Sequence, residues 1–292
     1  MPLHFPYDEE RPLLLGTLSW SDYQGHAGSL GRIEHIQVET ENNAAQLGNR
    51  TVVTNLYSTC LLIIENCSLT MNVAKNTLYA TNVVAEEVSV MDSDLKGEGG
   101  TFFSGIETTE FLYAEGLHLS INSYYPLGIE TNQGFTHLFN SKINVISNTG
   151  GGYGVLGSYY IQLENVNVDV SINKTSEQIV DYYSLTGISS LKSDGLSYIQ
   201  SSSINVDGYK NPSIVSLDSV IINGSTLSAQ ASKGRASGIA AAHVYFSQAQ
   251  SELHLSSSIK GKYFIGAKEF TNESLPPSVC QINDEPMMVC SK

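Results

Sequence analysis

The sequence predicts an all-β chain that folds as a parallel β-solenoid, and two repeated patterns support this prediction. An eight-residue phrase (apolar, any, small or Asn, any, any, apolar, polar, apolar) recurs seven times, starting at Ile64, Val83, Leu112, Leu138, Leu163, Ile199 and Leu217. A second marker, Gly or Ser followed by an apolar residue, recurs at Gly105, Gly128, Gly154, Gly187, Ser213 and Gly238. Both advance by about 25 residues a step, as stacked supersecondary units do.

Both patterns alternate apolar and polar residues with the period of strands, and neither shows the i, i+3, i+4 spacing of helices. A unit with two or three short strands cannot bury a core alone. Copies stacked at the interstrand spacing of about 4.8 Å can do so. We therefore expect about eight coils over residues 51–258, an N-terminal cap over residues 1–50 and a C-terminal cap over residues 259–292.

The phrase also predicts the direction of each side chain. Positions one, six and eight are apolar and should face the core, so position seven should face solvent. Position seven is polar in every copy: Thr70, Ser89, His118, Asn144, Asp169, Asn205 and Asn223. Position three is small or an amide and should lie where one strand bends into the next, because Asn tolerates left-handed backbone. Its residues are Asn66, Ala85, Ala114, Asn140, Asn165, Ser201 and Ser219.

With Asn66, Asn140 and Asn165 at such bends, residues 51–258 resemble the right-handed parallel β-helix (pectin-lyase-like) superfamily, which stacks asparagines at its turns. The resemblance implies an architecture, which lyases, hydrolases, phage tailspikes, adhesins and autotransporter passengers share. The catalytic residues of these enzymes have no match here. The resemblance would imply paired Asp motifs for a galacturonase, or a basic catalytic residue beside calcium-binding carboxylates for a lyase. The chain has no adjacent Asp pair, and none of its four arginines matches the lyase pattern: Arg11, Arg32, Arg50 and Arg235.

The composition excludes several partners. A formal charge of −14 and a pI near 4.8 argue against nucleic acid, which needs clustered Lys and Arg, and against anionic membranes. No apolar run approaches the roughly 20 residues of a membrane span. The first residues lack the apolar core of a signal peptide, which leaves a removed leader, leaderless export or a cytosolic location open. We expect an extracellular or cell-surface protein.

Four cysteines allow two disulfides, Cys60–Cys67 and Cys280–Cys290, and the alternative is four buried thiols. The second pair would close a small loop near the end of the chain. Because no His lies near either pair at metal-ligand spacing, we expect no zinc site.

The first candidate site is an acidic pair. The motif Gly-Ile-Glu occurs twice, which places Glu107 and Glu130 at equivalent positions of successive coils, roughly 5 Å apart. Such a pair raises the pKa of its members or attracts a cation, and its spacing approaches that of the carboxylates of retaining glycosidases. The alternative is a pair of solvated surface glutamates.

The second candidate is aromatic. The pairs Tyr124-Tyr125, Tyr159-Tyr160 and Tyr182-Tyr183, with Phe102-Phe103, recur with the coils, and one member of each should face outward. The outward rings would form a strip for sugar rings or a partner protein, or else be ordinary exposed tyrosines. The longest coil also carries an insertion with Glu177 and Asp181, and insertions in solenoids map to one face that often binds ligands.

No metal or cofactor site is expected. Asp92–Gly97 begins like a calcium loop but has Phe103 where a Glu ligand is required, and the Gly-rich Thr149–Gly154 lacks the Lys of a phosphate loop. Two function classes follow. The first is a non-enzymatic adhesin, passenger or host-directed factor that binds a polysaccharide or a host surface protein. The second is a carbohydrate-active enzyme, lyase or hydrolase, with Glu107 and Glu130 as its catalytic residues.

Overall fold

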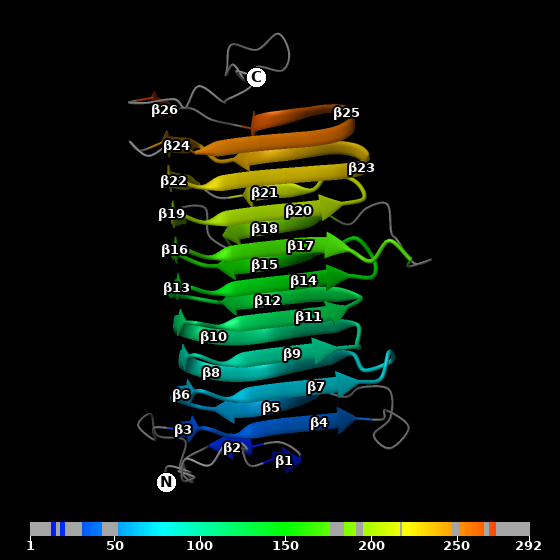
Figure 1. Cartoon of the computed structure of the whole chain (residues 1–292), viewed down its shortest axis with the longest axis vertical. Helices are drawn as coiled ribbons and strands as arrows, with labels where there is room; N and C mark the ends of the chain where they lie inside the picture. The colour runs from blue at the N-terminus through cyan, green and yellow to red at the C-terminus, as the bar shows by residue number, and fades with distance from the viewer. Residues whose placement is uncertain are drawn as a thin grey trace.

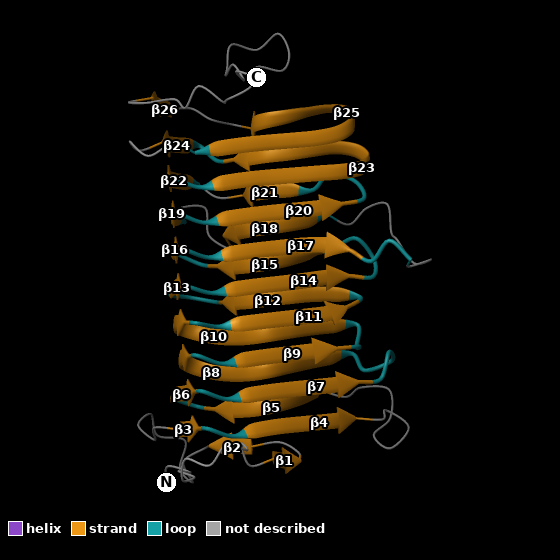
Figure 2. Ribbon diagram, in the orientation of Figure 1, coloured by secondary structure: helices purple, strands orange, loops and turns teal. Residues whose placement is uncertain are grey.

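The computed structural model describes residues 13–15, 18–20, 31–42, 52–175, 184–190, 195–216, 218–246, 251–265 and 269–272. These residues form strands and turns, and they wind into a parallel β-solenoid of about seven turns, as the sequence predicts (Figure 1). Helices are absent from the described residues, so none of these residues belongs to a helix that could cross a membrane (Figure 2).

Each turn contributes one strand to each of three parallel sheets. Sheet 1 contains β2 (Leu18–Trp20), β5 (Val52–Ser58), β12 (Tyr125–Thr131), β15 (Gly152–Gly157), β18 (Leu185–Ser190) and β21 (Ser213–Ser216). Sheet 2 contains β3 (Gly31–Glu34), β6 (Leu61–Glu65), β13 (Phe135–Phe139), β16 (Tyr160–Glu164), β19 (Leu196–Gln200), β22 (Ser219–Asn223), β24 (His243–Phe246) and β26 (Glu269–Asn272). Sheet 3 contains β1 (Leu13–Leu15), β4 (Gln37–Asn42), β7 (Ser68–Val73), β9 (Asp94–Glu98), β11 (His118–Ser123), β14 (Lys142–Ser147), β17 (Asn167–Ile172) and β20 (Ser203–Gly208).

Four long strands pass from one sheet to the next. The strands β8 (Tyr79–Met91) and β10 (Phe102–Glu115) run from sheet 1 into sheet 2. The strands β23 (Thr226–Ala240) and β25 (Glu252–Ile265) run from sheet 3 into sheet 1. Every strand pairs in parallel with its equivalents one turn away, so the backbone hydrogen bonds of the stack run between turns.

The core is a set of apolar columns along the solenoid axis. One column in sheet 1 contains Ile106, Ile129, Val155 and Ile188, which are register partners and fully buried. The Gly before each of them allows close approach between turns, because a Cβ on Gly128 would lie 2.3 Å from the carbonyl oxygen of Gly154. This explains the second sequence marker.

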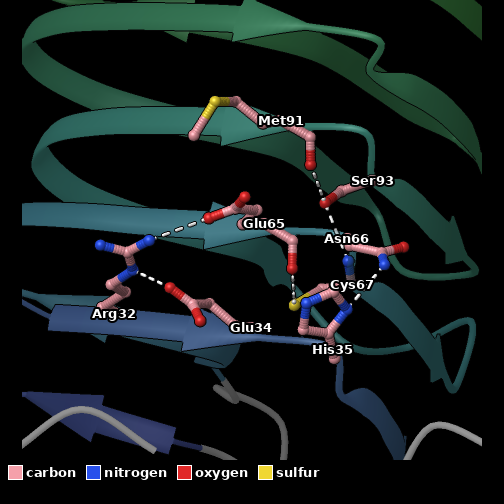
Figure 3. Close-up of polar contacts among 8 residues, drawn as sticks. All are labelled: Arg32, Glu34, His35, Glu65, Asn66, Cys67, Met91 and Ser93. Carbon is pink, nitrogen blue, oxygen red and sulfur yellow. Dashed lines mark hydrogen bonds and ion pairs between the residues drawn. The ribbon is translucent and has the colours of Figure 1, made fainter. Parts of the chain in front are cut away.

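In each of the eight turns where the structure describes it, the bend between sheets 2 and 3 is a single residue with positive φ. These residues have φ between 44° and 63°: His35, Asn66, Asp92, Gly116, Asn140, Asn165, Ser201 and Gly224. Asn and Gly suit this left-handed backbone. Asn165 Nδ2 donates to Asn140 Oδ1 at 2.8 Å, which confirms part of the predicted stack. The amide of Asn66 lies 2.6 Å from His35 Nδ1 instead (Figure 3).

A buried serine follows the bend in several turns and joins neighbouring turns. The Cys67 N–H donates to Ser93 Oγ at 3.0 Å, and Ser93 Oγ donates to the Met91 carbonyl at 2.7 Å (Figure 3). Ser141, Ser202 and Ser225 repeat this arrangement. Each hydroxyl thus satisfies a backbone donor where the strand ladder is interrupted.

The predicted register of the eight-residue phrase is wrong for three copies. The copies at Ile64, Leu138, Leu163 and Ile199 occupy one column, and the residues that share this column are Val90, Ala114 and Ile222. The copies that start at Val83, Leu112 and Leu217 match the phrase out of register, because every strand alternates in the same way.

Several side chains therefore lie in other columns than the sequence predicts. Asn144, Asp169 and Asn205 share the outward column of Thr70 in sheet 3, but His118 lies in the next column, between Asp94 and Lys142. Ser89 and Asn223 lie in sheet 2. The residues found at the bends are Asp92, Gly116 and Gly224, and not the predicted Ala85, Ala114 and Ser219.

Strands β1 to β4, the end of β25 and β26, which fall in the segments assigned to the caps, pair with the solenoid, and most other residues of those segments lie outside the described residues. Of the two alternatives for Cys60 and Cys67, a disulfide or buried thiols, the structure has the thiols. Both are buried thiols: Cys60 Sγ lies 3.2 Å from Ser58 Oγ, and Cys67 Sγ donates to the Glu65 carbonyl. Cys280 and Cys290 lie outside the described residues.

Candidate functional site

The predicted acidic pair is present on the outer face of sheet 1. Glu107 and Glu130 are register partners in β10 and β12, and both are half-buried. Their neighbours in the same column are apolar, Val84 on one side and Leu156 on the other. Burial raises the pKa of both carboxyls, and the charge of Glu107 raises the pKa of Glu130 further. Within the described part of the chain, no group of three His, Cys, Asp or Glu side chains could hold a metal ion.

The aromatic pairs that the structure describes lie on two different sheets, and not in the single strip that the sequence predicts. Tyr125 belongs to a ladder on sheet 1 with Tyr79, Phe102 and Tyr153, with ring centroids 5.2 to 6.3 Å apart. Tyr160 begins β16 in sheet 2. The inward–outward rule holds for Phe103 and Phe102, but neither member of the Tyr124-Tyr125 or Tyr159-Tyr160 pair is buried. The reason is that Tyr124 and Tyr159 precede their strands and belong to turns, where alternation does not apply. Tyr182, Tyr183, Glu177 and Asp181 lie outside the described residues.

A denser aromatic cluster covers sheet 2. The outward positions of β10, β13 and β16 form three columns over three turns, and six of these nine side chains are rings. We call this surface the aromatic face, and its rings belong to Phe111, Tyr113, Phe135, His137, Phe139 and Tyr160. It extends roughly 13 Å along the strands and roughly 10 Å across them, from the rise per residue and the interstrand spacing.

The rings of the aromatic face contact one another across turns. The ring of His137 lies 5.7 Å from Phe111, 6.5 Å from Phe139 and 5.5 Å from Tyr160, all edge to face. Phe135 contacts Tyr160 at 6.3 Å and is 51% exposed. The cluster is therefore ordered by its own contacts while still presenting apolar surface to solvent.

Amide and carboxylate groups border the rings on the same face. Tyr113 Oη donates to Glu115 Oε2 at 2.9 Å, and Tyr160 Oη donates to Gln162 Oε1 at 3.2 Å. Gln162 Nε2 in turn donates to Glu164. One turn further, Tyr198 Oη donates to Gln200 Oε1 at 2.7 Å. Amide or carboxylate groups thus occur beside the rings in β10, in β16 and in the next strand, β19.

The rings are uncharged near neutral pH. Partial burial lowers the pKa of His137, and the negative charge of Glu164 opposes this shift only in part. The hydrogen bond to Glu115 raises the pKa of Tyr113, and burial raises the pKa of Tyr160. The face therefore offers neutral aromatic surface with nearby hydrogen-bonding side chains.

A trough of about 370 Å³ follows the bend between sheets 2 and 3. Its residues include the bend residues Asn140, Asn165 and Ser201 and the first outward column of sheet 3, from His118 to Thr226. Phe139, Glu164 and Gln200 directly precede these bend residues, so the trough adjoins the aromatic face. Neither Glu107 nor Glu130 lines it.

The repeats in the sequence did not point to five rings of the aromatic face: Phe111, Tyr113, Phe135, His137 and Phe139. Their shared face becomes visible only when β10 and β13 are aligned from Phe111 and Phe135, and the out-of-register phrase at Leu112 concealed this alignment. Comparison with protein-family models, with curated proteins and with solved structures gives no match to this chain.

Proposed function

We propose that this protein is a non-enzymatic carbohydrate-binding β-solenoid of the cell surface or extracellular space, with the aromatic face as its binding surface. The observation that carries the proposal is the ordered grid of six rings on the solvent side of sheet 2. Contiguous exposed apolar surface on a soluble protein marks an interaction site. The bend asparagines also support membership of the right-handed parallel β-helix (pectin-lyase-like) superfamily.

The chemistry of the face suits a sugar. The C–H face of a pyranose ring packs on an aromatic ring, and its hydroxyls need hydrogen-bond partners at the edge of that ring. Gln162, Glu164 and Gln200 supply amide and carboxylate groups in these places. Tyrosine hydroxyls already hold Gln162 and Gln200, and Gln162 holds Glu164, so these side chains lose little conformational entropy on binding.

A glycan array combined with co-sedimentation on insoluble polysaccharides tests the proposal. The wild type should be retained by a defined set of glycans, and the double variant Phe135→Ala/Tyr160→Ala should not be. The double variant Tyr57→Ala/Tyr79→Ala is the matched control, because these exposed rings lie on sheet 1. Saturable binding to cells that resists glycosidase treatment, with no glycan bound, would point to a protein partner and contradict the proposal.

A carbohydrate-active enzyme with Glu107 and Glu130 is the second candidate. The half-buried register pair with raised pKa favours it, because one carboxyl held protonated beside one ionised carboxylate is the arrangement of glycosidases. Reducing-sugar and unsaturated-product assays on wild type and Glu130→Gln test this candidate. Turnover that disappears in Glu130→Gln would replace the binding proposal with an enzymatic one.

A further inference from the structure

The trough at the bend is built by successive turns of the solenoid. Its outer wall is one column of sheet 3, in which His118, Lys142, Asn167, Ser203 and Thr226 are register partners in order. Four interturn steps at about 4.8 Å give a length of about 19 Å along the solenoid axis. The trough therefore has the shape needed for an extended chain that lies across the strands.

The lining of the trough is mostly neutral and polar. Carboxamides and hydroxyls come from Asn140, Asn165, Asn167, Ser203 and Thr226. Asn167 Oδ1 is shielded from solvent and has no hydrogen-bond partner among the described residues. Lys142 is exposed and makes no ion pair within the described part of the chain. A ligand that both donates and accepts hydrogen bonds, without a net charge, fits this lining.

The trough does not fit the common ways in which proteins bind an extended peptide. Strand addition needs a free sheet edge, but the backbone groups of these strands pair with the turns on either side. Recognition of an amphipathic helix, a proline-rich segment or a phosphopeptide needs an apolar groove, an aromatic-lined groove or an arginine cluster, and the trough lining provides none of these. A long polyanion is opposed by the formal charge of −14.

We propose that the trough is a second subsite that holds a linear, neutral oligosaccharide parallel to the solenoid axis. This proposal rests on the proposed binding of carbohydrate by the aromatic face, and it extends that binding surface to a second subsite. Sugar rings that stack on the aromatic face continue around the bend residues, and the following units place their hydroxyls against the trough. The protein therefore selects long, unbranched, uncharged chains.

The test compares chain lengths in two matched double variants. The probes are linear neutral β-glucan, mannan and xylan oligosaccharides, from disaccharide to hexasaccharide, with polygalacturonate as the charged comparison. Lys142→Gln/Thr226→Val removes the ammonium group of Lys142 and the hydroxyl of Thr226 from the trough. Lys96→Gln/Thr70→Val makes the same changes on the outer face of sheet 3 but outside the trough. Isothermal titration calorimetry gives the affinities, and thermal unfolding confirms that each variant folds.

The wild type should bind the hexasaccharide of at least one series more tightly than the disaccharide. The trough variant should weaken hexasaccharide binding about fivefold, which corresponds to one lost hydrogen bond, and leave disaccharide binding unchanged. The control variant should bind like wild type. Three results would contradict the trough subsite without contradicting binding by the aromatic face. They are equal affinity of the two variants for the hexasaccharide, affinity that does not depend on chain length, and tighter binding of polygalacturonate than of the neutral chains. No binding of any glycan by wild type would overturn both proposals.

Discussion

Glu107 lies beside Glu130 on the outer face of sheet 1, as its register partner one turn away. Two carboxylates in this position repel each other, and each also has an apolar neighbour on its other side, Val84 beside Glu107 and Leu156 beside Glu130. Burial raises the pKa of both carboxyls, and the charge of Glu107 raises the pKa of Glu130 further. The pair therefore makes the stability of the solenoid depend on pH.

Glu130→Gln should increase the free energy of unfolding at pH 7. The pKa of Glu130 in the folded state lies above its value of about 4.3 in the unfolded state. The folded state is therefore most stable, as far as this pair is concerned, below about pH 4.3, where both carboxyls are protonated. This stability is lost as the pH rises through the folded-state pKa. Removing one charge should recover up to about 1 kcal/mol at neutral pH and nothing at strongly acidic pH. Urea unfolding at both pH values measures this. The exposed Glu98→Gln is the control, and an equal gain at both pH values would contradict the account.

Asn165→Ala should destabilise the solenoid more than Asn165→Gly. Both variants lose the hydrogen bond from Asn165 to Asn140, but only alanine also bears the cost of the positive φ of 54°. The left-handed conformation adds about 1–2 kcal/mol for alanine relative to glycine. Chemical denaturation of the two variants gives the difference directly. If the two substitutions cost the same, the bend does not require left-handed backbone.

Ser202→Ala should leave the N–H of Val166 without a partner. The Ser202 hydroxyl accepts this hydrogen bond at 3.0 Å, and it donates to the Gln200 carbonyl at 2.7 Å. An unsatisfied buried donor costs about 1–3 kcal/mol. Hydrogen exchange should show faster exchange of the Val166 amide, with unfolding at lower urea. The half-buried neighbour Ser203→Ala should have a smaller effect, and unchanged exchange at Val166 would count against the serine bridge.

His137 should titrate below its ordinary value of about 6.5. Its folded-state pKa is lowered mainly by burial among the rings of the aromatic face, so protonation favours the unfolded state. Stability should therefore fall as the pH drops from about 6.5 through the folded-state pKa. An NMR titration of the imidazole, with the urea-unfolded chain as reference, measures the shift. In Phe135→Ala, which opens the cluster to water, the pKa should move back toward the reference value. A wild-type value at or above the reference would contradict this packing.

The architecture was predictable because alternating apolar residues and recurring turn signals act locally in every coil. The glycine marker was also visible in the sequence for a structural reason. The Gly154 carbonyl approaches Gly128 so closely that a side chain at position 128 would clash with it. The pairing of Glu107 with Glu130 also followed from the repeated motif.

The register of the turns was less predictable. A strand that alternates in and out can shift without losing its inward apolar set, so the copies at Val83 and Leu112 matched the phrase in the wrong place. The bend residue was the more reliable marker, but Asp92 and Gly116 fill it as well as asparagine does. The aromatic face depends on this register across turns, which is why composition and spacing alone did not show it.

The most direct test of the binding account is the affinity of Phe135→Ala for the glycan that the wild type retains. Phe135 is the most exposed ring of the aromatic face, and Tyr57, 40% exposed on sheet 1, is the matched control. Isothermal titration calorimetry should show an affinity loss of about fivefold or more for Phe135→Ala, the minimum expected of an aromatic anchor, and no loss for Tyr57→Ala. Wild-type affinity in Phe135→Ala, with the fold intact, would contradict the assignment of this face as the binding surface.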